Sequence, residues 1–311
     1  MAAENSTICV TGGAGFIGAH LVAHLTARPG WRVRVLTRRG DAVLPAAATV
    51  VQGDLRDADA ARSFAARGAT VVNLAYAGDA HPDVNLAMAD NLAAACIEAG
   101  VARLVHCSTA VVVGRCARHT IVESTACSPA PGYQQTKLEI ERRLQARLHG
   151  KCPLTILRPT AVFGRGGANL CSAIDALRRE PWLLGALKYN LLADRRTHLV
   201  CVENVVAAIE FVIDSRLGPE LFIVSDDHAN DNDHRHVTGI LADELGMRRF
   251  PTLALPFRNA LAAVALRLAG RVDADPRRIY SDRKLRDRGF SPPCELAECI
   301  RRFARWYAHA A

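Results

Sequence analysis

The segment TGGAGFIG restricts most strongly what this chain can fold into. It places Gly12, Gly15 and Gly18 between a short β-rich run, TICVTG, and an amphipathic stretch, FIGAHLVAHLTA. Side chains are excluded where a strand turns sharply into a closely packed helix, and the free amides of a helix N-terminus attract phosphate. The segment therefore predicts a strand–turn–helix unit that binds a dinucleotide, with Phe16 and Ile17 opening the helix.

Runs rich in β-branched residues alternate with helical stretches through the first half of the chain. The runs are 7–12, 32–38, 48–54, 69–75, 103–109 and 153–159, and the helical stretches include 57–67 and 85–99. Apolar strands that alternate with helices are typical of a parallel sheet covered on both faces. The sequence predicts an α/β fold, a Rossmann-type doubly wound parallel sheet.

The composition is that of a globular protein with a substantial core. Half of the 311 residues are hydrophobic, 23% are charged and the formal net charge is +8. Basic residues are scattered in pairs such as Arg142-Arg143, without a long basic run interleaved with aromatics. We therefore expect a small anionic ligand rather than nucleic acid as the partner.

The ten cysteines include no C-x-x-C pair, so the spacing predicts neither a zinc site nor a redox pair. The acidic and histidine-rich segment 225–236 lacks metal-ligand spacing and is interpreted as a solvated loop. No metal is predicted. Cysteines inside apolar runs are typical of reduced cytosolic thiols, and the N-terminus does not resemble a signal peptide, so we expect a cytoplasmic protein. The apolar segment 261–270 is too short to span a membrane and contains Arg267.

The end of the second β-rich run indicates which cofactor is used. NAD enzymes usually carry an acidic residue there, which binds the ribose 2′-hydroxyl, but this chain has Thr37 followed by Arg38 and Arg39. A guanidinium suits a 2′-phosphate, which favours NADP, with NAD as the second choice. Asp54 and Leu55 are placed to flank the adenine.

The segment PGYQQTK places Tyr133 four residues before Lys137. In a helix the two side chains lie one turn apart on the same face. Taken alone, this spacing also fits a buried tyrosine beside a surface lysine.

Taken together, several motifs resemble the extended short-chain dehydrogenase/reductases, the NAD(P)-dependent sugar-nucleotide epimerase/dehydratase family. They are the glycine triad, GDLRD, NLAYAG, CSTAVVVG, VESTACSPAPGYQQTK, LRPTAVFGRGG, HLVCVENVVAAI and KLRDRGFSP. The resemblance implies that Thr109, Tyr133 and Lys137 are catalytic. It also implies that Leu74, Ala75, Pro159 and Val162 contact the cofactor and that Asn169, Arg195 and Arg196 contact the substrate. For the two arginines a surface position is the alternative.

The chemistry of these residue types agrees with that role. Hydride transfer to a carbonyl leaves an alkoxide that needs a proton, and tyrosine, with an ordinary pKa of about 10, is a poor base at neutral pH. An ammonium one turn away, such as that of Lys137, lowers the pKa of the phenol and can also bond the nicotinamide ribose. The Thr109 hydroxyl would polarise the substrate oxygen.

Some positions depart from the family pattern. The aromatic residue of the family's VYG triplet is missing at Val113-Gly114, and Cys201 replaces a histidine. The acid pair that follows the threonine in sugar-nucleotide dehydratases is replaced by Ala110-Val111, which cannot move a proton. A dehydratase is therefore not expected.

The resemblance implies a dinucleotide-binding domain at 1–165. The chain returns to this domain at 197–215. A smaller, mixed α/β C-terminal substrate-binding lobe comprises 166–196 and 216–311. We expect a reductase or epimerase of a sugar nucleotide. The alternatives are an NADPH-dependent reductase of a non-nucleotide ketone, as in steroid- and flavonoid-reducing relatives, and a non-catalytic NADP-binding regulator. Family members commonly dimerise through two helices, here 85–99 and 133–149, so we expect a homodimer.

Overall fold

The computed structural model describes residues 6–38, 40, 43–215, 217–253, 256–268 and 275–310. It divides into two compact units. Unit 1 contains Met1–Gly114, Pro129–Arg158 and Val206–Phe222, and unit 2 contains Arg115–Ser128, Pro159–Val205 and Ile223–Ala311. These divisions differ in detail from the predicted lobes, and the assignment of one lobe to substrate binding stays a prediction. Arg39 lies outside the described residues.

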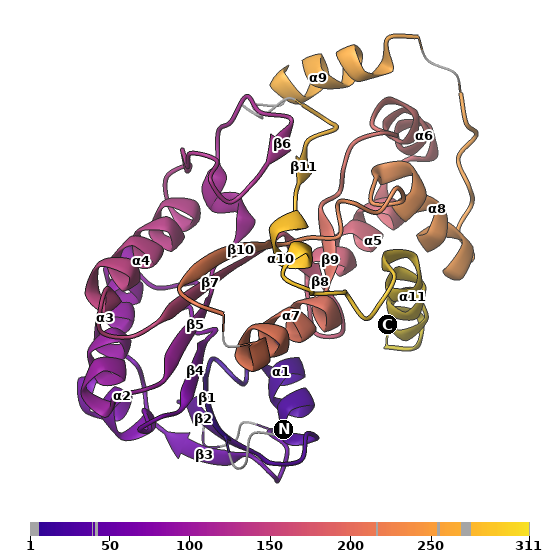
Figure 1. Cartoon of the computed structure of the whole chain (residues 1–311). Helices are drawn as coiled ribbons and strands as arrows, with labels where there is room; N and C mark the ends of the chain where they lie inside the picture. Colours follow the sequence, from indigo (N-terminus) through magenta and orange to yellow (C-terminus); the bar gives the residue numbers. More distant parts are fainter. Residues whose placement is uncertain are drawn as a thin grey trace. The chain divides into compact units, whose positions relative to one another are not determined.

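A seven-stranded sheet forms the centre of unit 1, in the order β10-β7-β5-β4-β1-β2-β3 (Figure 1). Its strands are β1 (Ser6–Thr11), β2 (Trp31–Thr37), β3 (Thr49–Gln52), β4 (Thr70–Asn73), β5 (Arg103–Cys107), β7 (Leu154–Pro159) and β10 (Glu220–Val224). From β3 to β7 every neighbouring pair is parallel. The predicted Rossmann-type parallel sheet is confirmed. The strand order reverses between β1 and β4, where α/β sheets place their ligands.

Helices cover both faces of this sheet (Figure 1). They are α1 (Phe16–Thr26), α2 (Ala58–Phe64), α3 (Pro82–Ala99), α4 (Tyr133–Leu148) and α7 (Val202–Ser215). α2, α3 and α4 lie on one face, whereas α1 and α7 lie on the other. Ion pairs of Arg28 with Glu210 and Asp214 join α1 to the part of α7 that belongs to unit 1.

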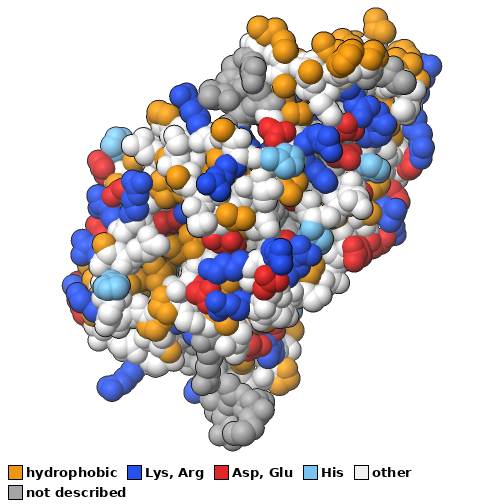
Figure 2. Space-filling model, turned by 45° about the horizontal axis from the view of Figure 1, so that its top comes forward, with side chains coloured by type: hydrophobic (Ala, Val, Ile, Leu, Met, Phe, Trp, Pro, Cys, Tyr) orange, Lys and Arg blue, Asp and Glu red, His pale blue; other side chains and the backbone are white. Residues whose placement is uncertain are grey.

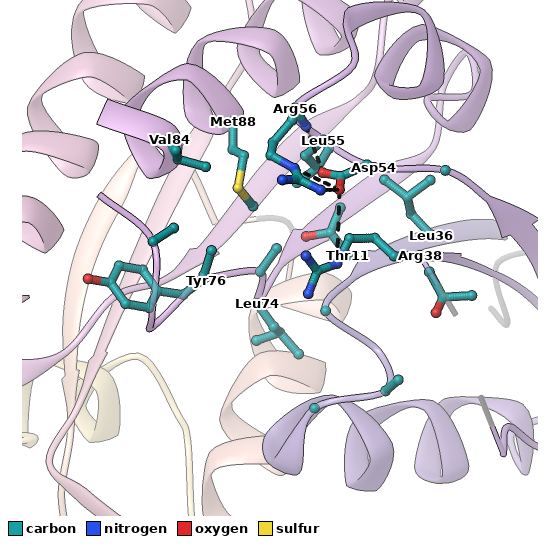
Figure 3. Close-up of a pocket in the computed structure, with 18 residues that line it drawn as sticks. Thr11, Leu36, Arg38, Asp54, Leu55, Arg56, Leu74, Tyr76, Val84 and Met88 are labelled. Carbon is teal, nitrogen blue, oxygen red and sulfur yellow. Dashed lines mark hydrogen bonds and ion pairs between the residues drawn. The ribbon is translucent and has the colours of Figure 1, made fainter. Parts of the chain in front are cut away.

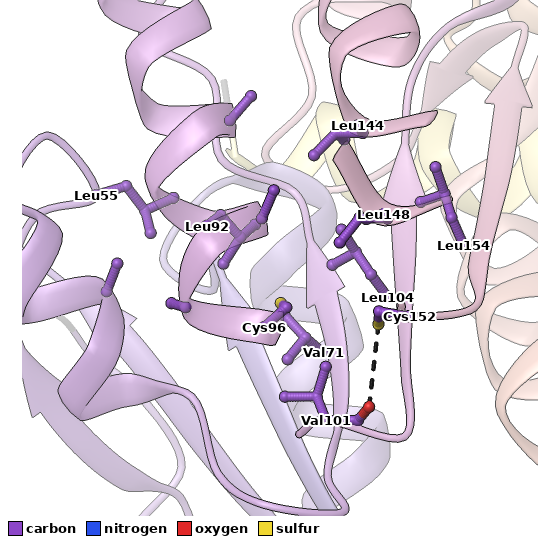
Figure 4. Close-up of a cluster of buried hydrophobic side chains, with 14 of the residues drawn as sticks. Leu55, Val71, Leu92, Cys96, Val101, Leu104, Leu144, Leu148, Cys152 and Leu154 are labelled. Carbon is purple, nitrogen blue, oxygen red and sulfur yellow. Dashed lines mark hydrogen bonds between the residues drawn. The ribbon is translucent and has the colours of Figure 1, made fainter. Parts of the chain in front are cut away.

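The core of unit 1 lies between the sheet and α2, α3 and α4 (Figure 4). Leu92, Leu104 and Leu144 are fully buried there. α3 ends at Gly100, whose φ of 65° is readily adopted only by glycine. A buried ion pair between Arg158 of β7 and Glu141 of α4 also fixes the helix to the sheet, with N···O distances of 3.0 and 2.6 Å.

Unit 2 contains two small parallel pairings, β8 with β9 and β11 with β6. Its elements are β6 (Thr120–Ile121), β8 (Ala161–Phe163), α5 (Asn169–Arg179), α6 (Trp182–Leu191), β9 (Leu199–Cys201), α8 (His234–Glu244), α9 (Arg258–Leu268), β11 (Ile279–Tyr280), α10 (Arg283–Asp287) and α11 (Leu296–Ala310). α11 packs on α8 around buried Phe303 and Leu241, in a second hydrophobic core.

The surface carries mixed charge. On the face drawn in Figure 2, basic and acidic side chains are interleaved rather than gathered into one basic patch. In the part of the chain that the structure describes, no helix is both long enough and apolar enough to cross a membrane.

Candidate active site

The glycine turn after β1 is held by close backbone contacts. Gly12 has a φ of +69°, and a Cβ on it would lie 2.7 Å from the carbonyl carbon of Leu74. A Cβ on Gly18 would lie 2.1 Å from the carbonyl oxygen of Gly12 and 2.7 Å from the Cα of Gly13. Real Cβ atoms do not approach so closely, so packing alone requires glycine at both positions.

Gly15 has a different reason to be glycine. The nearest atom to a Cβ there would be the Gly12 oxygen at 3.2 Å, so a side chain would fit only if the turn shifted by a few tenths of an ångström. Gly15 is the N-cap of α1, lines a cavity and provides no side-chain cap, and the first turn of the helix contains no acidic residue. A helix N-terminus left open in this way fits a pyrophosphate. Phe16, Ile17 and Gly18 form the start of this helix rather than the cavity wall.

The cavity has a volume of about 320 Å³ and lies wholly within unit 1 (Figure 3). Its lining includes seven predicted cofactor residues: Gly12, Gly15, Arg38, Asp54, Leu55, Leu74 and Ala75. Arg56, Tyr76, Val84 and Met88 also line the cavity and were not predicted from the sequence. Arg56 and Tyr76 directly follow predicted residues in GDLRD and NLAYAG, a proximity that could have indicated them.

Arginines surround the carboxylate at one end of the cavity (Figure 3). Asp54 accepts hydrogen bonds from Arg56 Nε at 2.8 Å and Nη2 at 2.6 Å, whereas Arg38 Nε lies 4.0 Å from its Oδ2. Burial alone raises the pKa of Asp54, but the bonds from Arg56 and the charge of Arg38 outweigh it and hold this pKa below its ordinary value. Asp54 is therefore ionised and already paired with Arg56, and the more exposed Arg38 is held only loosely.

A row of buried, hydrogen-bonded polar side chains lies beside the cavity. Thr11 donates to Asn73 Oδ1 at 2.7 Å, and Asn73 Nδ2 lies 3.1 Å from His106 Nδ1. Burial and the charge of Lys137 lower the pKa of His106 well below its ordinary value, so the imidazole is neutral. Because Asn73 Oδ1 also accepts from the Ala75 amide at 3.2 Å, this row of side chains fixes one wall of the cavity.

Tyr133 is the first residue of α4, and Lys137 is buried one turn later. The Lys137 ammonium donates to the Cys107 carbonyl at 3.1 Å, which ties it to the end of β5. Tyr76 joins the pair: its ring contacts the Tyr133 ring edge-on at 5.2 Å and lies 5.3 Å from Lys137 Nζ. The pair is therefore not a buried tyrosine beside a surface lysine, because it is the lysine that is buried.

The ionisation of both groups is shifted. Tyr133 is 49% exposed to solvent, but the partial burial of its phenol raises the pKa of that group. Cys107 and Tyr76 raise it further. A hydrogen bond with Thr109 acts in the opposite direction. Burial also lowers the pKa of Lys137. Tyr133 is therefore a neutral phenol that can donate a proton.

Thr109 occupies the turn after β5. Its side chain caps the short 3₁₀ turn Ala110–Val113 by accepting from the Val111 amide at 3.4 Å, and it lies close enough to Tyr133 to lower the pKa of that phenol. The structure thus brings the three predicted catalytic residues together at the carboxyl end of β5, all within unit 1. Their catalytic roles stay predictions.

The remaining predicted residues belong to unit 2. Pro159 ends β7, and Val162 lies in β8, where its carbonyl accepts from Asn169 Nδ2 at 2.8 Å. Arg196 donates to the Ala229 carbonyl at 2.7 Å, and half-buried Arg195 accepts at its own carbonyl from the His234 amide. These contacts belong to the packing of unit 2, so the predicted binding roles are neither supported nor contradicted by them.

Comparison with known proteins gives consistent matches. The sequence model of the NAD dependent epimerase/dehydratase family matches residues 8–224. A UDP-glucose 4-epimerase of Vibrio cholerae is 28% identical over 71% of each chain, and a 2-alkyl-3-oxoalkanoate reductase of Stenotrophomonas maltophilia is 33% identical over 56% of each. The structure of Thermus thermophilus UDP-glucose 4-epimerase, determined as a complex with NAD, superimposes with a TM-score of 0.72 at 22% identity. It covers 98% of this chain and 100% of that one.

The glycine contacts generate a prediction for cofactor binding. Gly18→Ala should lower the melting temperature and weaken the binding of reduced nicotinamide cofactor at least tenfold, because its Cβ would collide with the backbone that shapes the cavity. Fluorescence titration of the reduced cofactor and thermal unfolding measure the two effects.

Gly239→Ala is the matched control, because a Cβ there meets nothing within 4 Å and the residue lies in α8 of unit 2. The control should bind the cofactor as the wild type does. Equal affinity of Gly18→Ala and wild type would contradict the role of this contact.

Proposed function

Because the chain belongs to the NAD dependent epimerase/dehydratase family of extended short-chain dehydrogenase/reductases, we propose that Tyr133 exchanges a proton with a substrate carbonyl or hydroxyl during hydride transfer. The bound nicotinamide supplies or accepts the hydride. The observation that carries the proposal is the grouping of Thr109, Tyr133 and buried Lys137 at the end of β5.

Each residue then has a separate task. Tyr133 donates its phenolic proton to the developing alkoxide in reduction and receives a proton in oxidation. Lys137 places a positive charge one helical turn away and favours the phenolate. Thr109, whose side chain lies beside the phenol, donates to the substrate oxygen and positions it. In the oxidative direction the phenol must lose its proton, which its raised pKa opposes until a further positive charge is bound nearby.

We propose NADP as the preferred form of the cofactor. Arg38 follows Thr37 at the end of β2 and lines the cavity, and no acidic side chain replaces Thr37. Asp54 is the nearby carboxylate that would repel a 2′-phosphate, but Arg56 pairs with it. Arg38 is therefore available for the phosphate.

The proposed substrate is a sugar nucleotide. The relatives named as UDP-glucose 4-epimerases support this choice, and Arg195 and Arg196 of unit 2 are candidates to contact the diphosphate. A reductase of a non-nucleotide ketone is the second candidate. The relative named as a 2-alkyl-3-oxoalkanoate reductase favours it, as do the solvent-exposed apolar side chains Leu183 and Leu187 of α6.

A substrate panel distinguishes the two candidates. The purified protein is incubated with NADPH or NADP⁺ and with UDP-hexoses, keto-sugar nucleotides, 3-oxo acids or steroid ketones, and the reduced-nicotinamide band and the products are followed. Conversion of a nucleotide-linked sugar supports the first candidate, whereas conversion of 3-oxo acids or steroid ketones alone contradicts it.

Substitutions in the catalytic group should separate three kinds of effect. Tyr133→Phe removes one oxygen and keeps the ring on Tyr76, so turnover should fall about 10²–10⁴-fold while cofactor affinity and melting temperature change little. Lys137→Met should lose both turnover and cofactor affinity, and its residual oxidation rate should rise toward high pH as the unassisted phenol ionises. Thr109→Val should lower the rate without moving the pH profile.

Tyr307→Phe and Lys151→Met are the controls. Tyr307 bonds Asp175 in unit 2, and Lys151 is exposed, so both variants should retain the wild-type rate. Normal turnover of Tyr133→Phe would refute the proposed proton transfer, whatever the other variants do.

Cofactor preference should depend on Arg38. Loss of one charge-assisted bond to phosphate costs about 1.5–3 kcal/mol, so Arg38→Ala should bind NADPH roughly tenfold or more weakly and NADH nearly as before. Dissociation constants from fluorescence titration test this expectation. Arg32→Ala, an exposed arginine of the same strand β2, should bind both cofactors unchanged. A wild type that prefers NADH, or an equal loss for both cofactors in Arg38→Ala, would contradict the NADP assignment.

We also propose a homodimer through α3 and α4, the two helices that the resemblance indicated. Leu86 and Leu92 are buried in the core of their own chain, whereas Asp90 of α3 pairs with Arg143 and Arg147 of α4. A dimer formed by the outer sides of these helices would be polar and should weaken at high salt. Light scattering at micromolar concentration should give the mass of a dimer in dilute buffer. The mass of a monomer in dilute buffer would contradict the proposed homodimer.

A further inference from the structure

Three cysteines that are distant in the sequence meet in unit 2. Cys201 ends β9, Cys294 precedes α11, and Cys299 lies in the first turn of α11. Their Sγ atoms all lie within 4.8 Å of one another, and the Sγ atoms of Cys201 and Cys299 are 3.1 Å apart. Sulfurs that share one zinc ion at about 2.3 Å lie roughly 4 Å apart, so a small adjustment would suffice for them to bind one ion.

The backbone around the three thiols is held by hydrogen bonds. Asn204 accepts from the Cys294 amide at 3.1 Å and donates to the Cys294 carbonyl at 3.0 Å. The same side chain donates to the Asp226 carboxylate at 3.1 Å, and Asp226 accepts from the Cys201 amide at 3.4 Å. The backbone at Cys201 and Cys294 is thus joined through Asn204 and Asp226, which holds these two of the three thiols near one another.

A cation lies beside the sulfurs. Arg302 Nη2 is 3.7 Å from Cys299 Sγ and 3.9 Å from Cys294 Sγ, and it pairs with Glu203 at 2.7 Å. Three thiolates around a divalent ion leave a net negative charge. Arg302 offsets part of this charge, since Glu203 pairs with the same guanidinium, and it favours the thiolate form of the two sulfurs that it contacts.

From this geometry we propose that Cys201, Cys294 and Cys299 bind one thiophilic d¹⁰ metal ion, of the class of Zn²⁺ or Cu⁺, with Arg302 compensating the charge. Three sulfurs select soft ions over Mg²⁺ and Ca²⁺. Cys201 and Cys299 are buried and Cys294 is partly exposed, so the ion reaches the site from the Cys294 side, where a water can complete the coordination of zinc. The bound ion joins α11 to β9 and stabilises unit 2.

The proposed metal site does not depend on the proposed catalytic function, and none of its residues belongs to the catalytic group. It also differs from a disulfide between Cys201 and Cys299, which would not involve the Cys294 thiol and would require an external oxidant. The spacing of the cysteines did not predict this site, because Cys294 and Cys299 are five residues apart and Cys201 is distant in the chain.

The test uses the full-length, tag-free protein, reduced and freed of metal with a chelator. Titration with Co²⁺ should give one equivalent of binding with a sulfur-to-cobalt charge-transfer band, and Zn²⁺ should displace it and raise the melting temperature. Cys294→Ser, at a partly exposed position, should weaken Zn²⁺ binding at least about tenfold. Cys171→Ser, at a partly exposed cysteine of α5 in the same unit, should bind as the wild type does.

Arg302→Met gives a second and independent readout. It should weaken Zn²⁺ binding near neutral pH and recover affinity as pH rises, because higher pH ionises the thiols without help from the guanidinium. Absence of the charge-transfer band, or unchanged affinity in Cys294→Ser, would overturn the proposal. A Cys201–Cys299 disulfide in the protein as isolated, seen by mass spectrometry as loss of a hydrogen pair, would overturn it in favour of a redox link.

Discussion

The close contact between Gly18 and the turn at Gly12 and Gly13 is the constraint on which the candidate site depends. With a hydrogen atom at position 18, α1 can begin directly against the turn. The N-terminus of α1 therefore lies at the carboxyl edge of the sheet, and no side chain caps its amides. The strand order reverses at the same place, between β1 and β4. A methyl group at Gly18 would separate helix and turn, and the cavity between Gly15, Arg38 and Leu74 would lose its shape.

The second determinant is the burial of charge beside the phenol. Lys137 is removed from water and held by the Cys107 carbonyl, with Glu141 four residues later on the same helix. Glu141 is in turn fixed by Arg158 of β7. Lys137 is thus buried and held in place one helical turn from Tyr133, the position in which the proposed mechanism needs a positive charge. The protein by itself nevertheless raises the pKa of Tyr133, so the positive charge of an oxidised nicotinamide is the missing contribution that would favour the phenolate.

The sequence predicted those features that depend on local spacing. The glycine turn, the parallel strands and the proximity of Tyr133 to Lys137 each follow from a short periodic pattern, and the structure contains all three. The sequence could not indicate contacts between segments that are distant in the chain. Tyr76 on Tyr133 and the meeting of Cys201 with Cys299 are set by how β4, α4, β9 and α11 pack. The dimer expected from the resemblance stays a prediction: Leu86 and Leu92 of α3 pack in the core of their own chain, and an apolar stripe does not specify its partner.

The ionisation of Tyr133 tests the central claim most directly, since it reports the electrostatics without requiring a known substrate. Ultraviolet difference spectra of wild type and Tyr133→Phe are recorded across alkaline pH, with and without oxidised cofactor, and their difference isolates this phenol. Without cofactor its pKa should lie above the ordinary value of about 10, and bound NADP⁺ should lower it by about one unit or more. A pKa of Tyr133 that does not move when the cofactor binds would contradict the account.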